Sequence, residues 1–201
     1  MNAKKLACAP EDIDIHELWS EIDWNKCECF VQKLQARIVK AQREGRHGKV
    51  KSLQWLLTHS FYGRYLAVVR VTTNKGKNTA GVDHVRWSSD AAKVKAIDTL
   101  KRRGYQPQPL RRVYIPKKNG KTRPLGVPSF DDKLVQEVVR MVLEAIYEGH
   151  FEDTSHGFRP HRSCHTALNA VQKTFTGKKW FIEGDIKGFF DNVNHLSLIH
   201  I

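Results

Sequence analysis

The sequence lacks long hydrophobic runs, and its first ten residues contain no apolar segment of useful length. A membrane-spanning helix needs about 20 mostly apolar residues, and a secretory signal peptide also needs an apolar core. We therefore expect a cytoplasmic protein with no membrane partner. Internal repeats and low-complexity segments are also absent, which argues against repeat architectures and biased linkers.

Cysteine is scarce, at four residues in a chain of 201. Cys27 and Cys29 are separated by a single residue, which is tighter than the usual zinc-knuckle spacing. No second pair of cysteines or histidines lies at zinc-finger spacing. We therefore expect reduced thiols that are buried or inactive rather than a structural zinc site.

Acidic residues are missing from two long segments. Residues 45–82 contain seven Lys and Arg and no acid, and residues 101–123 contain nine Lys and Arg and no acid. Residues 131–153 reverse the balance, with seven acids and two bases, while the whole chain has a net charge of +13. Clustered cations favour a polyanionic partner, nucleic acid before membrane, because phosphate binding releases counterions. A merely soluble basic protein is the alternative.

The composition, with 40% hydrophobic and 27% charged residues, supports a folded chain. Residues 1 to about 25 are predicted to be a loose leader anchored by Trp19 and Trp24. Helical spacing then predicts a helix that carries Phe30, Leu34, Ile38 and Ala41 and is broken by Gly45 and Gly48. A second helix is predicted over residues 50–69, with Leu53, Leu57, Phe61, Tyr65 and Val68 on one face.

The turn-rich segment "TTNKGKNTAGVD" separates this second helix from a third. Ser89 or Asp90 is predicted to cap the third helix, whose apolar residues are Val94, Ile97 and Leu100. Residues 101–103, all Lys or Arg, are expected in its last turn, where they complement the helix dipole, and Gly104 is expected to end it.

The segment "RRVYIPKKNGKTRPLGVP" predicts a β-hairpin, because two short β-prone runs flank Asn119 and Gly120. Asn-Gly is the preferred pair for a two-residue turn in which both residues have positive φ. Lys117, Lys118, Lys121 and Arg123 lie at the tip and its flanks.

A fourth helix is predicted to start at Ser129, with Asp132 as a partner resembling a capping box. Its apolar face consists of Leu134, Val138, Met141, Val142 and Ala145. The loop "SHGFRPHRSCHTAL" is expected to lead into a short fifth helix, and residues 180–185 are predicted to form a strand that ends at Asp185.

Three features of the sequence contain residues that could bind a metal ion or phosphate groups. A carboxylate such as Asp185 at a strand end can bind Mg²⁺ together with waters and substrate phosphates, although Asp is also a routine strand terminator. Arg123 and Lys121 on the hairpin can hold phosphate oxygens, or the hairpin can be a solvated, solubilising element. Arg159 and Arg162 lie in a rigid basic loop, or they cap nearby carbonyls in a structural turn. The histidines around this loop form no recognisable ligand set.

Taken in order, "NKGKNTAGVD", "RRVYIPKKNGKTRPLGVPSFDDKLVQ", "SHGFRPHRSCHTAL" and "WFIEGDIKGFFDNV" resemble the group II intron-encoded reverse transcriptases, or maturases. The resemblance covers about residues 29–195. It implies an α+β fold, namely the N-terminal part of a right-hand polymerase with an incomplete palm. Residues 1–87 would be a helical RNA-binding extension, residues 88–178 the fingers and residues 179–195 the start of the palm.

The resemblance also implies roles for individual residues. Asp185 matches the first metal-binding, catalytic aspartate, and the carbonyl of Ile186 would be a further metal contact. Phe190 matches the bulky residue beneath the incoming sugar. Lys117, Lys118, Lys121 and Arg123 match fingers residues that hold the triphosphate. The expected RNA-binding residues are Arg37, Lys40, Arg64, Arg70, Lys75, Lys77, Arg111, Arg112, Arg159 and Arg162.

By this resemblance the complete protein would be an RNA-directed DNA polymerase that uses two Mg²⁺ ions and deoxynucleoside triphosphates. Its partners would be group II intron RNA, template RNA and a DNA primer. The family's Tyr-x-Asp-Asp motif does not occur in this sequence, so we expect an N-terminal fragment that is inactive alone. Residues 196–201 are expected to be non-native, because a sequencing adapter encodes the same six residues. A non-enzymatic RNA-binding splicing module is the alternative, and the oligomeric state stays open.

Overall fold

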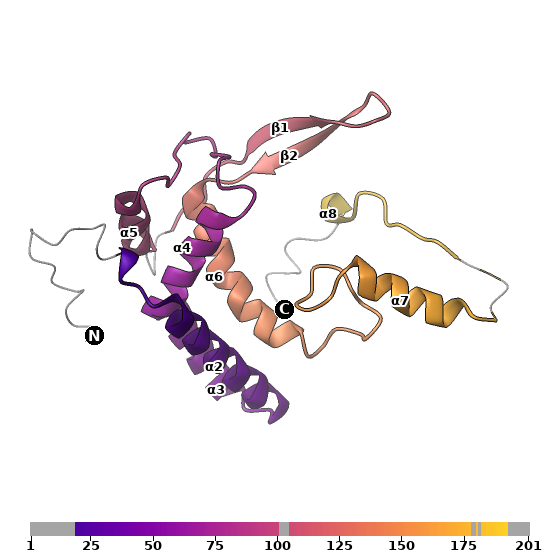
Figure 1. The fold of residues 1–201 in the computed structure, drawn as a ribbon, viewed down its shortest axis with the longest axis horizontal. Coiled ribbons are helices and arrows are strands. Elements are labelled where there is room, and N and C mark those ends of the chain that lie inside the picture. The colour runs from indigo at the N-terminus through magenta and orange to yellow at the C-terminus, as the bar shows by residue number, and fades with distance from the viewer. Residues whose placement is uncertain (1–18, 101–104, 178–179, 181, 193–201) are drawn as a thin grey trace, which may run out of the picture. The chain divides into compact units, whose positions relative to one another are not determined.

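The computed structural model describes residues 19–100, 105–177, 180 and 182–192. The expectations for residues 1–18, 101–104 and 196–201 lie outside this part of the chain. The described residues form a mixed structure of helices and one two-stranded antiparallel sheet (Figure 1). Its elements are α2 (Trp24–Arg43), α3 (His47–His59), α4 (Phe61–Thr73), α5 (Asp90–Thr99), β1 (Arg111–Pro116), β2 (Thr122–Val127), α6 (Phe130–Tyr147), α7 (Cys164–Phe175) and α8 (Phe189–Asn192).

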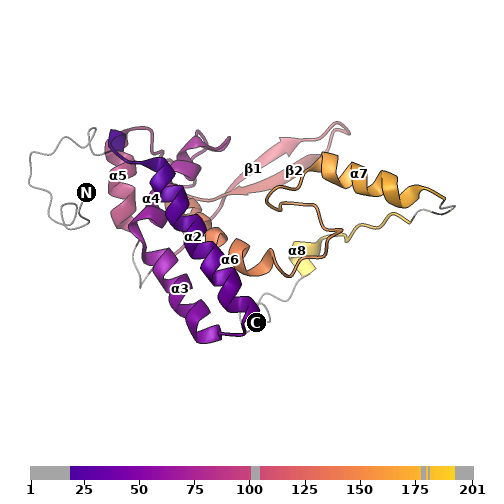
Figure 2. The same cartoon turned by 60° about the horizontal axis from the view of Figure 1, so that its bottom comes forward.

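The chain divides into two compact units, the first ending at Phe151 and the second beginning at Glu152. The first unit contains a helical core, in which α2 packs against α3, α4 and α6 (Figure 2). The most fully buried side chains of this core include Ile38, Leu57, Val68, Leu134 and Met141. Within α2 and within α6 the buried residues recur at helical spacing, so burying one apolar stripe per helix accounts for the packing.

The start of α2 confirms the predicted tryptophan anchors. Asp23 caps the helix by accepting a hydrogen bond from the backbone N–H of Lys26 at 3.0 Å. The ring centroids of Trp19 and Trp24 lie 5.1 Å apart, and both rings contact Tyr65. The helix ends as predicted before Gly45, whose φ of +66° favours glycine. Gly48, which was also predicted to break the helix, lies instead in the first turn of α3.

The single helix predicted over residues 50–69 is wrong, because Ser60 divides it into α3 and α4. Ser60 has extended backbone angles, and its Oγ accepts a hydrogen bond from the N–H of Gly63 at 2.9 Å. A Cβ on Gly63 would lie 2.7 Å from the carbonyl oxygen of Leu57, so the tight corner needs glycine. The apolar face continues across the corner, which is why periodicity alone did not reveal the break.

Ser89, one of the two residues predicted to cap this helix, caps the start of α5. The Oγ of Ser89 accepts a hydrogen bond from the N–H of Ala92 at 3.3 Å. The helix ends at Thr99, so it stops before the basic residues that were expected in its last turn.

The hairpin forms where the sequence predicts it, and Val113 lies opposite Leu125 in its register. The predicted two-residue turn is wrong. The N–H of Lys117 donates to the carbonyl of Lys121 at 2.7 Å, and the N–H of Gly120 donates to the carbonyl of Lys117 at 3.1 Å. Gly120 has a φ of +76°, whereas Asn119 is not among the described residues with positive φ. This pattern is that of a three-residue turn closed by a bulge at glycine.

Helix α6 confirms both the predicted cap and the predicted apolar face. The Oγ of Ser129 accepts a hydrogen bond from the N–H of Asp132 at 3.1 Å. The buried side chains on its core-facing side include all five predicted residues, Leu134, Val138, Met141, Val142 and Ala145.

The second unit contains α7, whose N-terminus carries a full capping box made by Ser163 and Thr166. The strand predicted over residues 180–185 does not form: residue 180 and residues 182–186 have no regular secondary structure. A strand requires a hydrogen-bonded neighbour, and the only sheet among the described residues pairs β1 with β2. No helix in the described part of the chain is both long and apolar enough to cross a bilayer.

Candidate nucleic-acid interface

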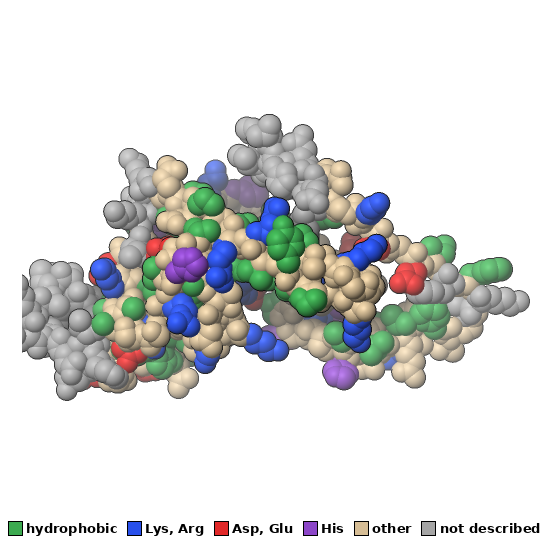
Figure 3. Space-filling model, turned by 90° about the horizontal axis from the view of Figure 1, so that it is seen from above, with side chains coloured by type: hydrophobic (Ala, Val, Ile, Leu, Met, Phe, Trp, Pro, Cys, Tyr) green, Lys and Arg blue, Asp and Glu red, His purple; other side chains and the backbone are tan. Residues whose placement is uncertain are grey.

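The tip of the hairpin presents four cations to solvent. Lys117, Lys118, Lys121 and Arg123 are all exposed, and the register places Arg123 opposite Ile115. Within the described chain, no ion pair engages any of the four. Figure 3, which looks down on the hairpin end of the first unit, shows Lys and Arg side chains interspersed with apolar ones. Such a ribbon can contact phosphate oxygens without first giving up a carboxylate partner.

The base of the hairpin is held to α6 by Asp132. Its carboxylate accepts hydrogen bonds from the Tyr105 hydroxyl, from the N–H of Gln108 at 3.3 Å and from the Oγ of Ser129 at 2.7 Å. Asp132 therefore joins the segment entering β1 to the start of α6. Asp132 also acts as the predicted capping-box-like partner of Ser129, because a hydrogen bond from the backbone of Ser129 helps to lower the pKa of its carboxyl.

The ionisation of Asp132 follows from these contacts. Burial alone would raise the pKa of its carboxyl, but the hydrogen bonds from Tyr105, Ser129 and Gln108 outweigh burial and hold that pKa below its ordinary value. Burial, followed by the hydrogen bond to Asp132, raises the pKa of Tyr105 well above its usual range. At neutral pH the hydrogen bond between these two side chains therefore joins an ionised Asp132 carboxylate to a neutral Tyr105 hydroxyl.

The motif "NTAGVD" packs directly on the start of α6. A Cβ on Gly81 would lie 2.6 Å from the Cα of Ser129, so only glycine permits this close approach. Lys133 donates a hydrogen bond to the carbonyl of Thr79 at 2.6 Å, and its Nζ lies 4.3 Å from the centroid of the Phe130 ring. Lys75 and Lys77, earlier in the same loop, are exposed. Sequence reasoning did not single out Lys133, whose structural role depends on this packing.

The predicted RNA-binding residues of the helices differ in their surroundings. Arg37 and Lys40 are exposed on α2, and Lys40 lies 3.9 Å from Glu44 in a weak surface pair. Arg64 and Arg111 are partly buried, and the Nε atom of each is buried with no hydrogen-bond partner among the residues that the structure describes. Arg112 is exposed on β1.

Arg70 instead belongs to an ion-pair network between α4 and α6. Its guanidinium lies 3.1 Å from Glu137, which also accepts two hydrogen bonds of 2.8 Å from Arg140. Arg140 also pairs with Glu144. Burial acts to raise the pKa of Glu137, but the hydrogen bonds from Arg140 and Arg70 hold it below its ordinary value.

Arg159 and Arg162 hold the loop before α7 in shape. Arg159 donates to the carbonyls of Glu152 and Ser155 at 2.7 and 2.9 Å, and Arg162 donates to the carbonyl of Asp153 at 2.9 Å. The alternative in which these arginines cap nearby carbonyls therefore describes the loop. The loop also contains Phe158, which has a φ of +56° and is fully exposed.

The candidate metal ligand Asp185 is exposed, and so is Ile186. Phe190 and Asp191 lie in α8, but their side chains are outside the described residues. The described chain contains no group of three or more His, Cys, Asp or Glu side chains that could hold a metal ion. One exposed carboxylate does not fit a two-magnesium centre, so the described residues do not complete such a site.

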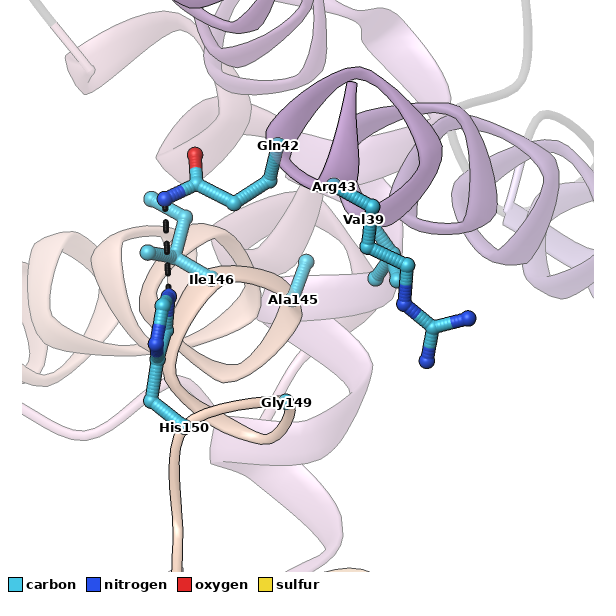
Figure 4. A pocket seen from close by; sticks show the side chains of 7 residues that line it. All are labelled: Val39, Gln42, Arg43, Ala145, Ile146, Gly149 and His150. Atoms are coloured by element: carbon cyan, nitrogen blue, oxygen red, sulfur yellow. Dashed lines mark hydrogen bonds between the residues drawn. The ribbon is translucent and has the colours of Figure 1, made fainter. Parts of the chain in front are cut away.

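A small cavity of about 110 Å³ lies between the C-terminal ends of α2 and α6 (Figure 4). Val39, Ala145 and Ile146 form apolar walls, and Gln42 Nε2 lies 3.5 Å from His150 Nε2 at its edge. Ligand pockets usually measure about 300–1,000 Å³, so this cavity is too small to hold a nucleotide. Elsewhere in α2, Cys27 is a buried free thiol whose pKa is raised by burial.

Comparison with known proteins identifies two family models along the chain. The model described as the N-terminal domain of reverse transcriptase matches residues 19–100. The model described as reverse transcriptase (RNA-dependent DNA polymerase) matches residues 115–201. The group II intron-encoded protein LtrA of Lactococcus lactis is 52% identical over 149 residues, which are 73% of this chain and 24% of LtrA.

The chain belongs to the group II intron-encoded reverse transcriptases. Protein YkfC of Escherichia coli is 44% identical over 141 residues, which cover 65% of this chain and 37% of YkfC. The nuclear intron maturase 1, mitochondrial, of Arabidopsis thaliana is 42% identical over 67 residues, which cover 33% of this chain and 9% of that protein. The chain thus spans about a quarter of LtrA and about a third of YkfC.

These matches confirm the resemblance predicted from the four motifs. The helices α2 to α5 lie in the part matched by the N-terminal domain of reverse transcriptase. The hairpin tip lies in the part matched by the reverse transcriptase model, and so does the segment that contains Asp185. The roles of the individual residues in this group II intron-encoded reverse transcriptase stay predictions.

Proposed function

We propose that the complete protein copies RNA into DNA and assists the splicing of the group II intron that encodes it. This chain supplies a helical RNA-binding extension over residues 1–87, the fingers over residues 88–178 and the start of a right-hand palm over residues 179–195. Its partners are intron RNA, template RNA, a DNA primer and deoxynucleoside triphosphates. Membership of the family and the net charge of +13 support this proposal.

The observation that carries the proposal is the exposed, cationic hairpin tip within the part matched by the reverse transcriptase model. Arg123 presents a planar fork that suits two phosphate oxygens, and Lys117, Lys118 and Lys121 add point charges around it. Because these side chains have no carboxylate partners in the described chain, binding a triphosphate breaks no internal ion pair. Phe190 is proposed to lie beneath the incoming sugar and to exclude a 2′-hydroxyl by its bulk.

The RNA-binding role rests on the cations that the fold leaves exposed. Arg37, Lys40, Lys75, Lys77 and Arg112 can contact phosphates directly. Arg64 and Arg111 each have a buried Nε with no hydrogen-bond partner in the described part of the chain, so RNA binding that moves these side chains can supply an acceptor for it. Arg70, Arg159 and Arg162 are held by internal acceptors, and we assign them the role of shaping the surface.

Asp185 is proposed to be one carboxylate of a magnesium site whose other ligands come from outside the described residues. In the complete protein, Asp185→Asn should abolish primer extension, because an amide has no charge to hold the metal, while affinity for intron RNA stays nearly unchanged. Extension assays and filter binding on the same preparation measure the two effects. Glu183→Gln, which removes an exposed carboxylate two residues away, is the matched control and should retain extension. Normal extension by Asp185→Asn would contradict the assignment.

A non-enzymatic splicing module is the second candidate. It needs only the basic surface of the helical extension, which carries the exposed cations Arg37, Lys40, Lys75 and Lys77. The two functions separate in the complete protein. Splicing without primer extension by the wild-type protein favours the module, whereas extension that depends on Asp185 favours the polymerase.

A further inference from the structure

The base of the hairpin lies beside the start of α6. Arg111, the first residue of β1, pairs with Val127 at the end of β2, and β2 leads directly into α6 (Figure 1). Cross-strand partners point to the same face of a two-stranded ribbon, and Val127 is buried on that face. The side chain of Arg111 therefore points to the face that meets the helical core, where Lys133 lies in the first turn of α6.

Arg111 is held in this position without an acceptor for its guanidinium. Its side chain is only partly exposed, and its Nε is buried with no hydrogen-bond partner in the described part of the chain. No described carboxylate forms an ion pair with it either. Burying part of a charged group costs free energy unless an acceptor offsets that cost, so this position suits an anionic ligand.

Lys133 brings a second cation to the same place. Its Nζ donates to the carbonyl of Thr79 at 2.6 Å, which fixes the ammonium group and uses one of its three N–H donors. Burial lowers the pKa of Lys133 below its ordinary value, Asp83 opposes this, and the charge of Arg111 adds to it. The two cations are therefore close enough to repel each other, and an anion between them would relieve that repulsion.

Asp83 is the carboxylate of the fold that could neutralise these two cations. Its Oδ1 accepts a hydrogen bond from the N–H of Val85 at 3.2 Å. Asp83 forms no ion pair with Arg111 or Lys133 in the part of the chain that the structure describes. Among these described groups, two positive charges thus face one negative charge, a balance that favours a phosphate group as the ligand.

We propose that Arg111 and Lys133 together hold one phosphate group at the base of the hairpin. This inference deepens the proposed function, on which it rests, by assigning that phosphate to the backbone of a bound RNA strand. Arg123 at the tip lies on the same face of the ribbon as Arg111, because its partner Ile115 is four residues along β1. Four residues of extended strand span about 13 Å, so a strand that runs along the hairpin can contact both places.

The test measures the binding of single-stranded RNA by the full 201-residue chain at several salt concentrations. A double variant with Arg111→Gln and Lys133→Gln should weaken binding about tenfold, because the phosphate loses both charge-assisted contacts. The slope of log affinity against log salt should fall by about 0.7, the value for one phosphate of a single strand. The two single variants should lose more free energy in sum than the double variant loses, since both cations share one phosphate.

Two further variants are matched controls for this sharing. Arg112→Gln removes an exposed cation that points to the opposite face of β1, so its loss should simply add to that of Lys133→Gln. Asp83→Asn removes the carboxylate that competes with the phosphate, and it should strengthen RNA binding about twofold to fivefold. Additive losses at Arg111 and Lys133, or a double variant that binds as wild type does, would overturn the proposal.

The unfolding midpoint separates binding from folding. Arg111→Gln should leave the midpoint unchanged, because the described fold gives this side chain no ion pair or Nε acceptor to lose. If Arg111→Gln weakens RNA binding only in proportion to a lowered midpoint, the side chain is structural and the proposal is overturned.

Sodium tripolyphosphate is the probe that works without RNA. It should raise the unfolding midpoint of the wild-type chain more than that of the double variant, because ligand that binds only the folded state stabilises it. Wild-type chain that binds no RNA would overturn the proposed RNA-binding function, while equal stabilisation of both proteins by tripolyphosphate would overturn the phosphate site itself. Stabilisation that depends on Arg111 and Lys133 without any loss of RNA binding would overturn the strand assignment and give the site to a free nucleotide.

Discussion

At the contact between α4 and α6, Arg70 and Arg140 share the carboxylate of Glu137, whereas the cations at the hairpin tip have no carboxylate partner in the described chain. Arg70 and Arg123 both come from acid-free, basic stretches of sequence. Arg70 and Arg123 thus look alike by composition. They differ because folding brings a carboxylate 67 residues away to Arg70, and the described fold brings none to Arg123. Charge clustering therefore indicates a nucleic-acid-binding protein. It does not show which cations contact the nucleic acid and which pair with carboxylates in the fold.

The largest effect is expected from removing Glu137, the carboxylate that pairs with both arginines at the contact between α4 and α6. Glu137→Ala leaves two arginines without their shared partner at a site where Glu137 is only 14% exposed. We expect a loss of about 2 kcal/mol in the free energy of unfolding, less than for a fully buried pair because both arginines keep contact with water. Thermal or urea unfolding measures this loss, and Glu28→Ala, at an exposed site on α2, is the control.

The effect of Glu137 should depend on pH. Its folded-state pKa is held below its unfolded value, so its contribution is fully present above the unfolded pKa, about 4.3. The contribution is lost as pH falls through the lower, folded pKa. The difference in stability between wild type and Glu137→Ala should therefore shrink in that acidic window. A difference that stays constant would contradict the assigned role of the ion pairs.

A smaller loss of stability is expected from a substitution at Asp132, where the hairpin joins the helical core. Asp132→Asn removes the charge that accepts hydrogen bonds from Tyr105, Gln108 and Ser129. We expect a loss of about 1–2 kcal/mol in the free energy of unfolding, since hydrogen bonds to a charged group are worth more than neutral ones. Asp98→Asn, at an exposed carboxylate on α5, should cost much less. Equal stability of the two variants would show that Asp132 does not hold the hairpin.

Local sequence signals predicted much of the fold. Ser89 and Ser129 cap helices as expected, and the apolar face of α6 follows the 3.6-residue period. Asn119 and Gly120 marked the hairpin correctly, although the loop has three residues rather than two. These features depend on residues within a turn or two of one another, which is why the sequence alone reveals them.

The features that sequence reasoning missed depend on distant residues or on steric detail. The corner at Ser60 requires Gly63 to approach Leu57, and apolar spacing that continues through the corner conceals it. The pairing of Arg70 with Glu137 requires α4 to pack on α6. The strand expected before Asp185 has no neighbour to pair with among the described residues.

The most direct test of the central claim compares Arg123→Ala with Arg70→Ala in the complete protein. The claim is that exposed cations of the hairpin bind the incoming nucleotide, whereas paired cations hold the fold. Arg123→Ala should raise the Michaelis constant for the nucleotide about tenfold, with RNA affinity and the unfolding midpoint unchanged. Arg70→Ala should lower the unfolding midpoint and leave that constant unchanged. If Arg123→Ala leaves the Michaelis constant unchanged, or weakens RNA binding instead, the account is contradicted.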